Sequence, residues 1–156
     1  MNVRRAEKRD IERINELLLD VAAIHNAGRP DIFKAGTKKY TDEELLSIIE
    51  NDKTPIFVAE DDTGYVLGYI FCIYQETRGS ILLHDMKTLY IDDLCVDKMK
   101  RGMKIGSALY EHALSEAKKS GCYNVTLNVW RLNDGAMRFY EKCGMSPLKT
   151  VMEKIL

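Results

Sequence analysis

The spacing of apolar residues in the first third of the chain predicts a short strand followed by two helices. The strand covers residues 2–5. The first helix runs from Asp10 to about Ala27, and Gly28-Arg29-Pro30 ends it. A capping box at residues 41–44, Thr-Asp-Glu-Glu, begins the second helix. The stripes that these helices bury are Ile14, Leu17, Leu18, Val21 and His25 in the first and Leu45, Ile48 and Ile49 in the second. We interpret His25 as a helix-end side chain rather than a ligand.

Apolar runs bounded by turn residues predict strands in the middle of the chain. Residues 55–60 and 65–74 flank a turn at 61–64 and form a hairpin, and another strand follows Gly79 and ends at Val96. The remaining pattern predicts a helix over 104–120, a strand over 123–130, a helix from Asn133 to Gly144 and a closing strand over 148–156.

The predicted order of elements is β-α-α-β-β-β-α-β-α-β, which indicates an α/β fold with a mixed sheet in a single domain over residues 1–156. The early hairpins make an antiparallel region. The helix between the strands at 89–96 and 123–130 makes those two strands a parallel pair. A ligand is therefore expected beyond the carboxyl end of the strand at 89–96.

Composition narrows the class of protein. The chain has 156 residues, is 46% hydrophobic and carries a formal net charge of −1. This charge gives no global attraction to nucleic acid or to an anionic membrane, so we expect neither as a partner. The sequence shows no signal-peptide core and no apolar run of membrane-spanning length, which favours a cytoplasmic protein. The four cysteines lack metal-ligand spacing, so we expect reduced thiols and no metal site.

The segment from Val96 to Leu109 carries the most chemical information. It is an apolar strand end, a basic turn with Gly102 and Gly106, and the start of a helix. Unpaired N–H groups and the helix dipole favour an anion at such a junction, and Arg101 and Lys104 add positive charge. The segment therefore suits a diphosphate, although a solvated basic turn has the same composition. It contains neither G-x-x-x-x-G-K-[ST] nor G-x-G-x-x-G.

Two motifs in this order resemble the GNAT N-acetyltransferase superfamily. The turn from Arg101 to Gly106 is similar to the family's acyl-CoA loop, Arg/Gln-x-x-Gly-x-Gly/Ala, except that Lys104 stands at the first glycine position. The run from Asn133 to Gly144 matches the pattern Asn-x-x-Ala-x-x-Phe-Tyr-x-x-x-Gly. A lysine with positive φ would cost about 1 kcal/mol relative to glycine. We expect a negative φ at Lys104, with its ammonium beside phosphate.

The resemblance implies acetyl-CoA as co-substrate, held in a V between the strands at 89–96 and 123–130. It also implies that one set of residues binds the cofactor: the backbones of Leu94, Cys95 and Val96 along the pantetheine, the loop Arg101, Gly102, Met103, Lys104, Ile105, Gly106 and Ser107 at the diphosphate, and Asn133, Ala136 and Tyr140 on the last helix. Asn133 could equally be a plain helix cap.

Tyr140 matches the family tyrosine that faces the CoA sulfur. Protonation of a thiolate by an ordinary tyrosine is uphill by roughly 2 kcal/mol, so Tyr140 either sits in a tuned site or donates a hydrogen bond. The alternative is that Tyr140, like Phe139, only packs in the core.

The acidic pair Asp92-Asp93 near the end of a central strand resembles the spermidine/spermine acetyltransferase branch. This implies an amine acceptor, with Asp92 as the general base and Asp93 attracting ammonium. Repulsion between the carboxylates could raise one pKa. Alternation sends the two side chains to opposite faces unless a bulge intervenes. Both could instead cap the sheet edge or pair with basic residues.

The loop at 28–40 is expected to cover the acceptor together with strand ends near His84 and Trp130, and Phe33 and Trp130 are the candidate contacts. The favoured function is direct transfer of acetyl from acetyl-CoA to a primary amine of a small molecule, of the polyamine or amino acid type, or of a peptide. A CoA-binding sensor without catalysis is the alternative, and a nucleotide-binding regulator is a third class. Among the relatives that the chain resembles, dimers are common, so we expect a homodimer.

Overall fold

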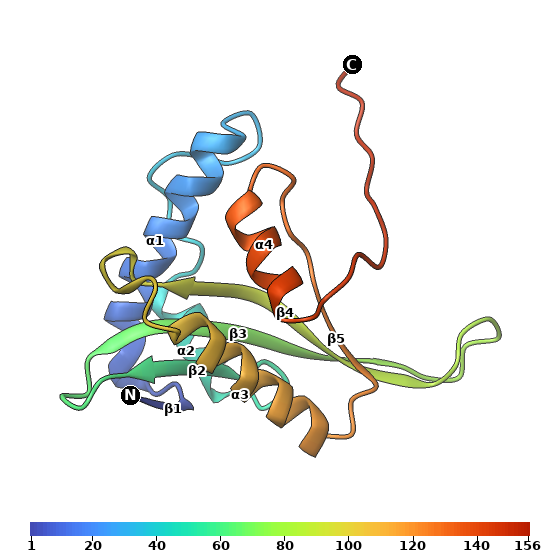
Figure 1. The fold of residues 1–156 in the computed structure, drawn as a ribbon, viewed down its shortest axis with the longest axis horizontal. Coiled ribbons are helices and arrows are strands. Elements are labelled where there is room, and N and C mark those ends of the chain that lie inside the picture. The colour runs from blue at the N-terminus through green and yellow to red at the C-terminus, as the bar shows by residue number, and fades with distance from the viewer.

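The computed structural model describes residues 1–156 and contains one five-stranded sheet with helices on both faces (Figure 1). The strand order in the sheet follows the chain: β1 (Asn2–Arg5), β2 (Ile56–Glu60), β3 (Val66–Thr77), β4 (Met86–Val96) and β5 (Asn124–Leu127). The helices are α1 (Ile11–Gly28), α2 (Asp42–Glu50), α3 (Ile105–Lys119) and α4 (Asp134–Lys142), with short 3-10 turns η1 (Lys8–Asp10) and η2 (Lys98–Lys100). No helix combines the length and the apolar character that crossing a membrane requires.

The first four strands are antiparallel neighbours, and β4 and β5 are parallel, as the pattern predicts. One core lies between the sheet and α1 and α2, and its fully buried side chains include Ile14, Leu45 and Tyr69. A second core lies under α3 and includes Leu89, Ile105 and Leu109. Residues of α4 pack against this second core. The two cores therefore pack helices against both faces of the sheet and hold in place the strands that form the site.

Local chemistry sets the helix boundaries. Thr41 and Glu44 form both bonds of the predicted capping box, with Glu44 N–H donating to Thr41 Oγ1 at 3.1 Å and Thr41 N–H donating to a Glu44 carboxylate oxygen at 2.8 Å. Asn133 caps α4 by accepting from Ala136 N–H at 3.1 Å, which confirms its reading as a helix cap. By contrast, α3 begins at Lys104 without any side-chain cap.

A bulge in β4 changes the course of the chain at the predicted acidic pair. Phe71 pairs with Asp93 and Cys72 with Ile91, so Asp92 is the extra residue. The parallel ladder with β5 also ends at Ile91, which pairs with Leu127. Beyond this point β4 continues for five residues without a neighbour on that side, and the two strands diverge (Figure 1).

Three predictions about the fold are wrong. Residues 148–156 form no strand, and they run away from the body of the molecule (Figure 1). The strand predicted over 123–130 is hydrogen-bonded only over β5, because the divergence from β4 removes its partner beyond Leu127. His84 lies in the turn that joins β3 to β4, at the start of β4 and therefore far along the strand from Asp92, so it does not adjoin Trp130.

Candidate active site

The diverging ends of β4 and β5 leave main-chain groups of β4 free to bind a ligand. Asp97 N–H donates to Leu67 O at 2.9 Å, which makes this a hydrogen-bonded pair of the antiparallel ladder with β3. Because such pairs alternate along a ladder, the backbone of Cys95 faces β3, whereas the backbones of Leu94 and Val96 face the opening. An extended ligand can therefore pair with Leu94 and Val96 as an added strand.

The turn after β4 presents a row of unpaired N–H groups. Six consecutive residues have no acceptor within the protein for their backbone N–H: Gly102, Met103, Lys104, Ile105, Gly106 and Ser107. The last three open α3, whose dipole adds partial positive charge at the same point. Arg101 and Lys104 are exposed beside this row. This arrangement suits the diphosphate of a CoA ester, and the absent side-chain cap leaves the groups accessible.

Lys104 has φ of 61°, and it is the only non-glycine residue of the chain with a positive φ. The expectation of a negative φ is therefore wrong. The left-handed conformation costs a residue with a Cβ about 1 kcal/mol or more, and the chain keeps a lysine there nonetheless. The turn keeps the shape that the missing glycine would favour, with an added ammonium at its edge.

Lys104→Gly should raise the free energy of unfolding by about 1 kcal/mol, because glycine adopts this conformation without a Cβ clash. Lys104→Ala keeps the strain and removes the charge, so its stability should match the parent protein. Chemical denaturation of the three proteins measures the difference. A Gly variant no more stable than the Ala variant would show that the turn is not strained.

Arg13 of α1 holds the start of this turn, and sequence reasoning missed it. Its guanidinium donates to Asp97 and to Val66 O, the latter at 3.2 Å, and lies 4.8 Å from the centroid of the Tyr65 ring. Asp97 in turn accepts from Met99 N–H at 2.8 Å and begins the 3-10 turn η2. No local motif marks Arg13, because its partners lie 53 and 84 residues away.

The bulge at Asp92 places both carboxylates of the acidic pair toward α1, α2 and the loop between them. Asp92 accepts from Lys39 Nζ at 2.9 Å, and Asp93 accepts from the Tyr69 hydroxyl at 3.0 Å. Burial raises the pKa of Asp93, and the positive charge of Lys39 opposes this rise. Burial lowers the pKa of Lys39 ammonium, but its bond to Asp92 and the charge of Asp93 outweigh that effect and raise the pKa.

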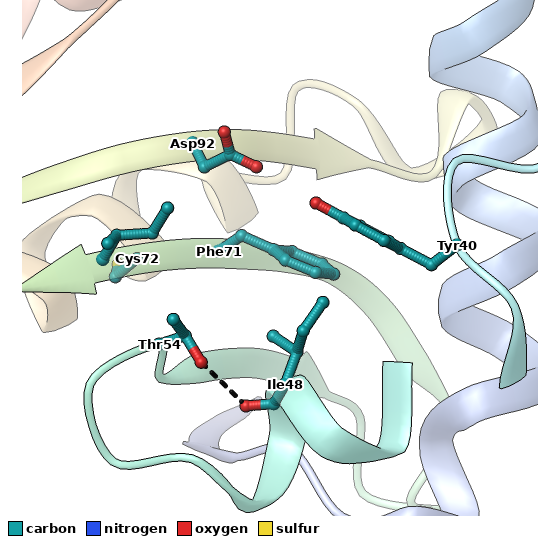
Figure 2. A pocket seen from close by; sticks show the side chains of 7 residues that line it. Tyr40, Ile48, Thr54, Phe71, Cys72 and Asp92 are labelled. Atoms are coloured by element: carbon teal, nitrogen blue, oxygen red, sulfur yellow. Dashed lines mark hydrogen bonds between the residues drawn. The ribbon is translucent and has the colours of Figure 1, made fainter. Parts of the chain in front are cut away.

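A small cavity of about 60 Å³ lies beside Asp92. Figure 2 shows the Asp92 carboxylate and the Tyr40 hydroxyl directed toward this space, with the Phe71 ring below Tyr40. The Tyr40 and Phe71 rings are stacked with centroids 6.1 Å apart. Lys39 Nζ lies 5.3 Å from the centroid of the Tyr40 ring. The cavity thus combines aromatic faces with negative charge, a combination that favours a cationic amine.

Tyr140 of α4 lies close enough to the acidic pair for the charge of Asp93 to act on its phenol. Burial raises the pKa of its phenol well above the ordinary value, and the negative charge of Asp93 adds to the rise. Its hydroxyl has no hydrogen-bond partner in the protein, although the ring packs against Phe139 at 5.0 Å and Tyr110 at 6.2 Å between centroids. The phenol therefore stays protonated and has a free donor. A raised pKa makes complete proton transfer to a thiolate less favourable, so donation of a hydrogen bond fits better than transfer.

The loop between α1 and α2 meets the chain after β5, as expected. Phe33 and Trp130 pack edge to face with centroids 5.1 Å apart, and His25 lies 4.9 Å from Phe33. A second cavity of about 140 Å³ is lined by these three rings and by Arg29, Arg131, Ile24, Gly28, Leu132 and Asn133. It lies between the end of α1 and the start of α4. His25 is thus an aromatic packing partner at the helix end.

Residues 6–145 match the family model described as Acetyltransferase (GNAT) family. The chain belongs to the GNAT acetyltransferase family. It is 30% identical over 117 residues to a glucosamine 6-phosphate N-acetyltransferase of Arabidopsis thaliana, a match that covers 75% of this chain and 68% of that protein. Its fold resembles that enzyme's crystal structure with a TM-score of 0.68 at 26% identity, over 99% of this chain and 97% of the other.

A crystal structure of a point mutant of the BH1408 protein from Bacillus halodurans is more similar still. Its TM-score is 0.96 at 29% identity, and the match covers 100% of this chain and 99% of the other. The family membership makes this GNAT protein an N-acetyltransferase, and acetyl-CoA is the co-substrate that the family implies. The open strand end and the unpaired N–H row fit that co-substrate.

Proposed function

We propose that this GNAT protein transfers acetyl from acetyl-CoA to the primary amine of a small molecule, in the space between Asp93 and Tyr140. The row of six unpaired N–H groups from Gly102 to Ser107 supports this proposal most directly, because it gives the diphosphate a fixed place. The free backbone of Leu94 and Val96 then directs the pantetheine along β4 toward the acidic pair.

The residues of the site divide the proton chemistry between them. Acetyl-CoA supplies the activated acetyl group. Asp93, directly or through water, removes a proton from the incoming ammonium, and an N–H of Leu94 or Val96 donates to the thioester oxygen as negative charge develops there. Tyr140 donates a hydrogen bond to the sulfur as its bond to carbon breaks. The nitrogen attacks the thioester carbon, and the second proton that it loses passes to the leaving sulfur, so the C–N bond forms, the C–S bond breaks and CoA is released as a thiol.

The geometry favours Asp93 as the base, with Asp92 in the role of holding ammonium. This exchanges the roles expected from the sequence. Asp92 is already paired with an ammonium, that of Lys39. Asp93 combines a raised pKa with one carboxylate oxygen that accepts from no protein group. A raised pKa brings a carboxylate closer to the basicity that proton removal at neutral pH needs.

Asp93→Asn should remove the rise in rate with pH that marks deprotonation of the base, whereas Asp92→Asn should keep the rise and weaken amine binding. The Asp93 pKa is raised on folding, so its contribution to stability is present at low pH and lost as pH rises through the raised value. Asp93→Asn should therefore be at least as stable as the parent at neutral pH. Initial rates across pH, with thermal unfolding in parallel, test both statements. If the rate of Asp93→Asn still rises with pH as that of the parent does, Asp93 is not the base.

The acceptor combines an amine with a larger group, because two cavities adjoin the site. The cavity at Asp92 and Tyr40 suits the amine. The larger one, with Phe33, Trp130 and Arg131, suits an aromatic, sugar or anionic part, since Arg29 is already paired with Asp31 and Glu153. The acceptor named for the similar Arabidopsis thaliana enzyme, glucosamine 6-phosphate, has an amine and a phosphate on one small molecule. Amino sugars and amino acids therefore join polyamines as candidates.

Release of free CoA thiol from acetyl-CoA, measured over panels of amino sugars, amino acids, polyamines, aminoglycosides and peptides, tests the function. We expect amine-dependent release with at least one class of small amine, and the acetylated amine as product by mass spectrometry. Tight CoA binding without release from any panel would favour the sensor without catalysis.

A further inference from the structure

Lys39, in the loop between α1 and α2, holds a primary amine against the acidic pair of β4. Its Nζ donates to the Asp92 carboxylate at 2.9 Å, and the negative charges of Asp92 and Asp93 both act on it. No other basic side chain of the protein forms an ion pair with either carboxylate. An ammonium of the chain itself therefore lies where the proposed function places the ammonium of the acceptor.

The residues that follow Lys39 fix the position of its backbone. The Tyr40 ring stacks on Phe71 of β3 with centroids 6.1 Å apart, and Thr41 is the N-cap of α2. Figure 2 shows Tyr40 at the small cavity that Asp92 faces, and Lys39 Nζ lies 5.3 Å from the centroid of the Tyr40 ring. The contact between Lys39 and Asp92 therefore starts from an anchored segment of the loop rather than from a free one.

The acidic pair also contains the group that can remove a proton from Lys39. Burial lowers the pKa of the Lys39 ammonium, but its bond to Asp92 and the charge of Asp93 outweigh burial and raise the pKa. The amine therefore stays an ammonium until a base takes its proton. Asp93 has a pKa raised by burial and one carboxylate oxygen that accepts from no protein group. The base of the proposed function is thus close enough for its charge to act on Lys39.

The distance from this amine to the expected thioester is short. The proposed function places the pantetheine along the free backbone of Leu94, two residues beyond Asp92, and strand geometry makes that separation about 7 Å. The Lys39 side chain has a flexible four-carbon stem and is 38% exposed, so it has room to move. A partly exposed ion pair contributes little stability, so Lys39 can leave Asp92 at small cost.

We propose that Lys39 is a self-acetylation site, at which the enzyme transfers acetyl from its own bound acetyl-CoA to the Lys39 amine. This inference rests on the proposed function, because it uses the same donor and the same base. Asp93 takes one proton from the ammonium, and the nitrogen attacks the thioester carbon, so the C–N bond forms and the C–S bond breaks. The second proton that the nitrogen loses passes to the sulfur, CoA leaves as a thiol, and Asp93 gives its proton to water. The product is a neutral amide without a charge to pair with Asp92.

Mass spectrometry tests the proposal after the full chain is incubated with acetyl-CoA that carries an isotope-labelled acetyl group, with no amine added. We expect one label per chain, located at Lys39 by peptide mapping, at a rate per chain that does not change with protein concentration. Lys39→Arg keeps a positive charge and should take up no label. Lys38→Arg is the matched control, because Lys38 pairs with Asp42 on the surface, and it should be labelled at the rate of the parent. A label spread over exposed lysines, or a rate per chain that rises with protein concentration, would overturn the proposal.

The Tyr140→Phe variant separates enzymatic from spontaneous acetylation. It should slow labelling of Lys39 by the same factor as transfer to a free amine, at least about tenfold. Labelling that Tyr140→Phe leaves unchanged while transfer to a free amine slows would mean spontaneous acetylation and would overturn the proposal.

Thiol release with free amines separates this inference from the proposed function. If the parent acetylates a free amine while Lys39 stays unlabelled at saturating acetyl-CoA, the contact between Lys39 and Asp92 is only a structural ion pair, and the self-acetylation alone is wrong. If acetyl-CoA binds and neither Lys39 nor any free amine is acetylated, the proposed function is wrong as well.

Discussion

Tyr140→Phe should lower kcat at least about tenfold and leave the Kd for acetyl-CoA nearly unchanged. The substitution removes only the hydroxyl, which has no partner in the protein, so folding and ring packing should be preserved. The substitution removes the O–H group that would donate a hydrogen bond to the sulfur as negative charge develops there. Because the pKa of Tyr140 is raised, the phenol is protonated at every pH where the enzyme would work. Stopped-flow or steady-state thiol release, beside calorimetric titration with acetyl-CoA, measures the two quantities.

Tyr110→Phe is the matched control. Tyr110 is another buried tyrosine, on α3, and its ring lies 6.2 Å from that of Tyr140. It belongs to the core under α3 and does not line the space at Asp93. Loss of the Tyr110 hydroxyl should leave kcat equal to that of the parent protein within experimental error. Equal rates for parent and Tyr140→Phe would remove Tyr140 from the mechanism and restore its interpretation as a core residue.

Gly68→Ala should destabilise the protein by about 2–3 kcal/mol, because the new methyl group has no room. A Cβ at this position would lie 2.6 Å from Cys95 O and 3.2 Å from Val96 Cα, both of them backbone atoms of β4. β4 would have to move at the point where its free edge is expected to bind the pantetheine. Thermal unfolding should shift down by roughly 4–12 °C, and acetyl-CoA binding should weaken.

Gly28→Ala controls for the loss of a glycine as such. A Cβ there would meet only Leu132 Cδ1, at the ordinary contact distance of 3.7 Å. Since alanine favours a helix over glycine, this variant should be no less stable than the parent. If Gly68→Ala were as stable as Gly28→Ala, β3 and β4 could move apart at Gly68 without a measurable cost in stability.

Local chemistry explains which elements the sequence predicts well. The Thr41 capping box, the Gly28 helix end and the Asn133 cap depend on neighbours within a few residues, and all three are present in the structure. The parallel pair follows from the helix between its strands. The family resemblance is carried by two such local runs, at 101–106 and 133–144.

Features that depend on distant contacts were not predictable in the same way. The bulge at Asp92 arises from pairing with β3. The sequence alone did not show whether a bulge would place both carboxylates on one face of the sheet. The bond from Lys39 to Asp92 and that from Arg13 to Asp97 join positions 53 and 84 residues apart. Residues 148–156 have the composition of a strand but no neighbouring strand within the chain, so β propensity gave the wrong prediction. The positive φ at Lys104 reflects the geometry of the turn overriding residue preference.

We propose that main-chain N–H groups of the turn after β4 bind the diphosphate of acetyl-CoA. Amide resonances of Gly102–Ser107, followed by ¹⁵N–¹H correlation spectra during titration with CoA, test it most directly. We expect large, saturable shifts at these six amides with CoA, and none of comparable size with pantetheine, which has the same thiol arm but no diphosphate. Unmoved amides in this turn at CoA saturation, or equal affinity for CoA and pantetheine, would contradict it.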